Sequence, residues 1–107
     1  MGKSNMVVLP DTLKILQKLG RQIKKARVRR NLSAEDIAKR VGIARTTLWA
    51  VEKGAPEVGI GVYAAVLKEL GLDRELGMIA EDREYQSKIQ DISSLVRKRA
   101  TGKKGEE

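Results

Sequence analysis

The chain has 107 residues, enough for one small domain, and its 22 Lys and Arg outnumber 14 Asp and Glu, giving a formal net charge of +8. Apolar residues make up 41% and aromatic residues only 3%, so a core must be built from aliphatic side chains, which suits packed helices. Because the sequence contains no Cys and no His, it excludes disulfide scaffolds, thiolate or imidazole metal sites and Cys or His catalysis. Catalysis could then use only an all-carboxylate or a Lys/Tyr site. Since no arrangement of residues supports such a site, we expect no metal, no cofactor and no enzymatic activity.

The first helix is expected near the N-terminus. Asp11 can cap a helix whose apolar residues recur at three- and four-residue steps. Gly20 inside this segment costs up to about 1 kcal/mol in a helix, so a start near Leu19 is an open alternative. We assign residues 1–18 to an N-terminal arm and the start of this helix, with residues 6–9 as an extended, strand-like piece.

Two short helices are predicted next, over residues 34–41 and 45–53. Ser33 is a good N-cap, and Asp36 three residues later completes a capping-box pair. Gly42 supplies the left-handed residue that ends the first of these helices. A tight glycine turn between two short helices is typical of a helix-turn-helix unit.

Three further helices are expected toward the C-terminus. One covers residues 60–70, a short one is capped by Asp73 and reaches Ala80, and a long one covers residues 82–100. The tail of residues 101–107 is expected to be disordered. The long helix carries an apolar stripe made of Tyr85, Ile89, Ile92, Leu95 and Val96.

An apolar stripe on a terminal helix must be covered, and in so small a chain a partner subunit is a natural cover. We therefore interpret Tyr85, Ile89, Ile92 and Val96 as core or, preferably, as a dimer or partner interface. The acidic residues Glu81, Asp82 and Glu84 are interpreted as helix N-terminal charges that the helix dipole favours, in preference to a metal or acid/base site.

The positive charge is concentrated in residues 19–73, which hold eleven basic and six acidic residues. Six of the cations fall within residues 21–30. Cations that neutralise phosphates release counterions, so a polyanion is the first partner to consider. The alternative is that these cations form an ordinary solvated helix face.

Four motifs follow one another in this segment: Leu19-Gly20-x-x-Ile23-x-x-Ala26-Arg27, Leu32-Ser33-x-x-Asp36-Ile37-Ala38, Val41-Gly42-Ile43-x-Arg45-Thr46-Thr47-Leu48 and Val51-Glu52-Lys53-Gly54. At this spacing, residues 19–73 resemble the Cro/C1-type (XRE family) helix-turn-helix domain. The resemblance implies an all-α, lambda-repressor-like domain of five helices, followed here by a helical extension over residues 74–100. It also implies a homodimer that binds double-stranded DNA at a palindromic operator.

The helix over residues 45–53 is the expected recognition helix. Its apolar residues Leu48 and Val51 take the packing side, which leaves the opposite side for the major groove. Arg can bind the O6 and N7 atoms of guanine bidentately, so Arg45 is the leading candidate. Trp49 either stacks on the sugar-phosphate wall or packs on Lys53 or a neighbouring helix. The expected base contacts are Arg45, Thr46, Trp49 and Ala50.

The expected phosphate contacts come from several segments. The N–H groups that open the helix at residues 34–41 suit a phosphate, although Ala34 lacks the Gln side chain that many relatives carry there. Arg27 and Glu52 stand where the family pairs an Arg of the first helix with a Glu of the third, and we interpret them as a structural ion pair. Ala44 replaces the usual Ser cap. The full set of expected phosphate contacts is Lys24, Arg27, Ser33, Ala34, Thr47 and Lys53.

The C-terminal part of the chain is similar to the end of HipB-like antitoxins, which are encoded with a HipA-like kinase toxin. The similarity lies in three short stretches: Ala80-Glu81-Asp82, Gln90-Asp91 and Arg97-Lys98-Arg99. The resemblances imply a DNA-binding transcriptional repressor that autoregulates a type II toxin–antitoxin operon. The alternatives are a stand-alone or phage-type Cro/C1 regulator, or a module that acts mainly by protein–protein inhibition of a toxin.

The sequence also predicts where the protein resides. The longest stretch without a charged residue, 58–67, is far shorter than the roughly 20 residues that cross a bilayer. No signal peptide is visible. We therefore expect a cytoplasmic protein with no membrane partner.

Overall fold

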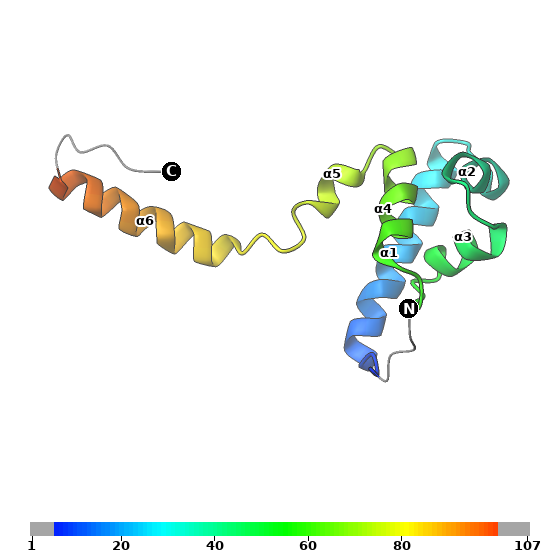
Figure 1. The fold of residues 1–107 in the computed structure, drawn as a ribbon, viewed down its shortest axis with the longest axis horizontal. Coiled ribbons are helices and arrows are strands. Elements are labelled where there is room, and N and C mark those ends of the chain that lie inside the picture. The colour runs from blue at the N-terminus through cyan, green and yellow to red at the C-terminus, as the bar shows by residue number, and fades with distance from the viewer. Residues whose placement is uncertain (1–5, 101–107) are drawn as a thin grey trace. The chain divides into compact units, whose positions relative to one another are not determined.

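The computed structural model describes residues 6–100, apart from the side chains at position 94 and positions 97–100. The expected disordered tail, residues 101–107, lies outside the described residues. The described chain is all-α, which confirms the predicted fold class (Figure 1). Its helices are α1 (Pro10–Arg29), α2 (Ala34–Val41), α3 (Arg45–Glu52), α4 (Ile60–Glu69), α5 (Asp73–Leu76) and α6 (Arg83–Ala100). The chain divides into two compact units, Met1–Leu76 and Gly77–Glu107, of which the second contains α6.

Helix α1 is continuous from Pro10, so the alternative start near Leu19 is wrong. Proline suits the first helical position, because its missing N–H has no partner there and its φ is already helical. Asp11 lies in the first turn and is not the N-cap; the N-cap is Leu9, which makes no side-chain capping bond. The extended piece expected at residues 6–9 forms no strand, since these residues have no regular secondary structure, although the backbone of Leu9 is extended.

Gly20 stays within α1 because the helix approaches the end of α3 there. A Cβ atom on Gly20 would lie 2.5 Å from the carbonyl oxygen of Glu52 and 2.6 Å from the backbone nitrogen of Gly54. Real Cβ atoms do not approach backbone atoms so closely. The helix therefore contains a residue of poor helix propensity in exchange for a close contact between the two backbones.

The predicted local signals around α2 are confirmed. The backbone N–H of Asp36 donates to Ser33 Oγ at 3.0 Å, and the N–H of Ser33 donates to Asp36 Oδ2 at 3.2 Å, which is a complete capping box. Gly42 ends the helix with φ +85°. The chain then re-enters a helix at Arg45, so α2 and α3 are joined by a short turn.

The core of the first unit lies among its helices, where α3 packs on α1 and α2 and where α4 packs on α2 and α5. Its largest fully buried side chains are aliphatic, as the composition predicts: Ile23, Ile37, Leu48, Val51 and Val66. Tyr63 on α4 is also buried, and its hydroxyl donates to the carbonyl oxygen of Ala55 at 2.8 Å. Burial raises the pKa of this phenol, with a smaller contribution from the negative charge of Glu57.

Helix α5 is shorter than predicted. It ends at Leu76, directly before Gly77, so the expectation that it reaches Ala80 is wrong. Asp73 is its first residue and not its cap. Helix α6 begins at Arg83, and the Oδ1 atom of Asp82 accepts from the backbone N–H of Tyr85 at 3.0 Å.

We expect Gly20→Ala to lower the free energy of unfolding by about 1–3 kcal/mol, because the added methyl group forces the backbone of Glu52 and Gly54 to shift. The matched control is Gly61→Ala on α4, where an added Cβ meets nothing within 4 Å and the better helix former is neutral or stabilising. Urea unfolding followed by circular dichroism measures both. Equal stability of the two variants would contradict the close contact at Gly20.

Candidate nucleic-acid interface

Helix α3 has one buried side and one exposed side. Leu48 and Val51 are 0% exposed and lock the helix into the core. The N-cap, Ala44, has no polar side-chain atom and makes no side-chain hydrogen bond, so α3 begins with a poor cap. On the other side, the candidate base and phosphate contacts are exposed at Arg45, Thr46, Trp49 and Lys53 and half-buried at Thr47 and Ala50.

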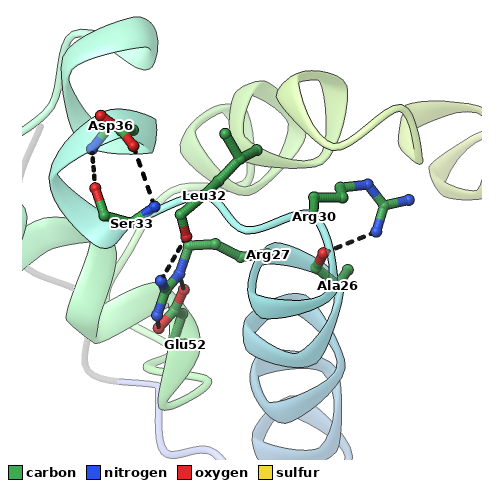
Figure 2. A network of polar contacts seen from close by, with 7 residues as sticks. All are labelled: Ala26, Arg27, Arg30, Leu32, Ser33, Asp36 and Glu52. Carbon is green, nitrogen blue, oxygen red and sulfur yellow. Dashed lines mark hydrogen bonds and ion pairs between the residues drawn. The ribbon is translucent and has the colours of Figure 1, made fainter.

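Arg27 joins three segments of the domain (Figure 2). Its Nε atom donates to Glu52 Oε2 at 2.7 Å and its Nη2 atom to Glu52 Oε1 at 3.2 Å, a bidentate pair between α1 and α3. Its Nη1 atom donates to the carbonyl oxygen of Leu32 at 2.9 Å, just before α2. The side chains of Arg27 and Glu52 are 12% and 7% exposed. This geometry makes the pair an anchor for α3, and it engages three of the five donors that a guanidinium has.

The N-terminus of α2 is already occupied by its own cap (Figure 2). The pKa of the Asp36 carboxyl is held below its ordinary value of 3.8 by two hydrogen bonds. The larger contribution comes from the side chain of Ser33 and the smaller one from its backbone. The helix N-terminus therefore carries an ionised carboxylate at neutral pH. A phosphate at Ser33 and Ala34 would have to bind beside this negative charge, so these are the expected phosphate contacts that local chemistry favours least.

Trp49 is 49% exposed, and the guanidinium carbon of Arg45 lies over its ring, 5.9 Å from the centroid. Neither alternative drawn from the sequence for Trp49, the DNA wall or packing on Lys53 or a neighbouring helix, includes this contact. The signal that could have found it is the spacing, because residues four apart on a helix are neighbours on its surface.

Some basic side chains near the end of α1 have a partner within the described part of the domain and others do not. Arg27 is engaged in the ion pair, and Nη1 of Arg30 donates to the carbonyl oxygen of Ala26 at 2.8 Å (Figure 2). Lys24 is exposed, and the ion pairs among the described residues do not involve it. Its ammonium group is therefore free to meet a phosphate.

The candidate interface residues of α6 lie in the second unit and are exposed there. The exposed fractions are 60% for Tyr85, 41% for Ile89, and 57% for both Ile92 and Val96. The neighbouring carboxylates have ordinary local partners: Asp82 accepts from the helix backbone, and Glu81 lies 3.8 Å from Arg83.

Residues 6–100 contain neither a candidate metal site nor a candidate membrane span. No group of three or more carboxylates there could hold a metal ion. None of the helices there has both the length and the apolar character needed to cross a bilayer.

Comparison with known proteins identifies the segment that runs from within α1 to the end of α5 as a helix-turn-helix domain. A family model described as a helix-turn-helix domain matches residues 18–76, more than half of the chain. An uncharacterized HTH-type transcriptional regulator of Methanocaldococcus jannaschii is 35% identical to this chain over 63 residues. That alignment covers 59% of this chain and 96% of the archaeal protein.

We expect Glu52→Ala to lower the free energy of unfolding by about 3 kcal/mol or more, because it leaves the guanidinium of Arg27 largely buried without its carboxylate. The double variant Arg27→Met with Glu52→Leu is expected to lose much less, since no charge is then left unpaired. Chemical denaturation of the full chain measures these differences.

The matched control is Glu35→Ala. It removes a carboxylate that lies 3.9 Å from Lys39 in an exposed pair, and exposed pairs contribute little. A loss for Glu52→Ala as small as that of Glu35→Ala would show that the pair with Arg27 does not anchor α3.

Proposed function

The chain belongs to the helix-turn-helix domain family, and from this premise we propose that it regulates transcription as a sequence-specific DNA-binding repressor. The observation that carries the proposal is the two-sided nature of α3. Leu48 and Val51 are fully buried, while Arg45, Thr46 and Trp49 are exposed on the other side. A helix that reads the major groove needs this division, since one side must be anchored while the other meets base edges.

Arg45 is proposed as the principal base-reading residue, because it opens α3 and its donors match the O6 and N7 acceptors of guanine. Thr46 can donate to a base or contact a thymine methyl group. Ala50 is half-buried and contributes a small apolar surface. Lys53 and Lys24 are exposed cations suited to phosphates, and the formal net charge of +8 favours approach to DNA.

We propose further that the repressor is a homodimer held by α6. Tyr85, Ile89, Ile92 and Val96 follow one another at steps of four, three and four residues, which is the spacing of a coiled-coil seam. All four are exposed on α6. A second copy of the same helix offers the matching surface, and a two-fold dimer would place two recognition helices about 34 Å apart on a palindromic operator.

The finer proposal, that the protein is the autoregulating antitoxin of a type II operon with a HipA-like kinase toxin, is supported by the short resemblance within residues 80–99. Its alternatives are a stand-alone or phage-type Cro/C1 regulator and a module that inhibits a toxin mainly by protein contact. A kinase-like reading frame beside the gene supports the antitoxin proposal. The lack of one contradicts it and leaves the repressor proposal intact.

We expect Arg45→Ala to weaken binding to the duplex upstream of the protein's own gene by about tenfold to a hundredfold, because a bidentate guanine contact is lost. Mobility shift of that duplex with the full chain is the measurement. Arg74→Ala on α5 removes the same charge from an exposed site away from α3 and is expected to change binding little.

The salt dependence of the parent protein provides the second readout. Binding should weaken steeply between low and moderate salt, because several phosphates exchange counterions for Lys and Arg. A flat response, or an Arg45→Ala variant that binds as tightly as the parent, would contradict the proposed function.

Ile89→Asp is expected to shift the protein from dimer to monomer, since a carboxylate cannot be accommodated in an apolar seam without a partner. Ser87→Asp, on the same helix and outside the stripe, is the matched control and should leave the dimer unchanged. Analytical ultracentrifugation distinguishes the two states. A parent that sediments as a monomer, or an equal response of both variants, would refute dimerisation through α6.

A further inference from the structure

The side chains of Arg45 and Trp49 contact each other on α3. The guanidinium carbon lies 5.9 Å from the centroid of the indole ring, within the range in which a cation is attracted to an aromatic face. Among the residues that the structure describes, Arg45 takes part in no ion pair. Trp49 is the single Trp of a chain that has no Phe and 3% aromatic residues.

Trp49 is not part of the hydrophobic core. The core side of α3 is filled by Leu48 and Val51, both 0% exposed, whereas Trp49 is 49% exposed. Trp49 is absent from the buried core cluster and from the partly buried apolar residues that pack against it. A large aromatic side chain thus stands on the same exposed side of α3 as the candidate base-reading residues.

The contact follows from helix geometry. Side chains four residues apart are neighbours on a helix surface, and a helical side chain leans toward the N-terminus. The indole of Trp49 therefore reaches back over the turn that carries Arg45. The first turn of α3 contains no acidic residue that could draw the guanidinium elsewhere.

We infer that Trp49 is a positioning residue that holds Arg45 for bidentate binding to a guanine, so that each operator half-site contains a guanine opposite Arg45. An aromatic ring engages a guanidinium through its flat face, and all of the N–H donors lie in the guanidinium plane. The donors remain free to pair with O6 and N7 of guanine. This inference rests on the proposed function of α3 as a recognition helix.

The competing role for Trp49 is direct contact with DNA, and a double-mutant cycle separates the two. If Trp49 acts through Arg45, its removal has no further effect once Arg45 is absent. If Trp49 contacts DNA itself, the two losses add.

The experiment uses the full chain and a duplex selected by it from a randomised library, with a scrambled duplex of equal length as reference. Trp49→Leu should weaken binding to the selected duplex by about 2- to 12-fold, the range expected when a side chain that was held in place must be immobilised on binding. Trp49→Phe retains an aromatic face and should recover most of that loss. In the Arg45→Ala background, Trp49→Leu should cause no further loss, and Trp49→Leu should leave binding to the scrambled duplex unchanged.

A modified base tests the guanine itself. Replacing the selected guanine with 7-deazaguanine removes the N7 acceptor, so it should weaken binding of the parent, weaken binding of Trp49→Leu less, and leave Arg45→Ala unaffected. In the free protein, Arg45→Ala should alter the fluorescence of Trp49, which is the only indole in the chain.

Additive losses in the cycle, a Trp49→Leu variant that binds as the parent does, or an unchanged fluorescence would overturn the positioning role alone. A parent that prefers no duplex over the scrambled one would overturn the proposed function together with it. Thermal unfolding of the Trp49 variants checks that they remain folded, as expected for a side chain outside the core.

Discussion

The close approach of α1 to the C-terminal end of α3 is the constraint on which the rest of the domain depends. It requires a missing side chain at Gly20, where a Cβ atom would meet the backbone of Glu52. It is secured by the bidentate pair of Arg27 and Glu52, two side chains that are 12% and 7% exposed. The missing side chain of Gly20 and the largely buried pair of Arg27, about two turns apart on α1, thus determine where α3 lies.

Once α3 is anchored there, its two sides acquire different roles. Leu48 and Val51 continue the aliphatic core and Glu52 pairs with Arg27, whereas Arg45, Thr46 and Trp49 are exposed. The exposed aromatic ring of Trp49 and the guanidinium of Arg45 can then interact with each other instead of with the core. A helix that reads bases in the major groove needs a rigid support on one side and accessible side chains on the other.

The second unit differs from the first in the exposure of its apolar side chains. Helix α6 is amphipathic, yet its apolar side chains are exposed, from 41% at Ile89 to 60% at Tyr85. Helical stability in proteins comes mostly from burying such a stripe, not from intrinsic propensity. A second copy that covers the stripe would therefore stabilise α6.

The amino-acid sequence alone determined the features that depend on neighbours along the chain. The capping box of Ser33 and Asp36, the left-handed turn at Gly42 and the aliphatic core follow from local hydrogen bonding and periodicity, and these predictions hold. The family motifs also led to the pairing of Arg27 with Glu52.

Predictions failed where a contact between residues far apart in the sequence outweighs a local preference, or where no such contact forms. Gly20 remains helical because α3 lies against it, which helix propensity does not report. The expected extension of α5 to Ala80 failed because Ile79 is 69% exposed, so no packing draws residues 79 and 80 into a helix. The contact between Arg45 and Trp49 became visible only in three dimensions, since side-chain conformation depends on the space and charges that surround each residue.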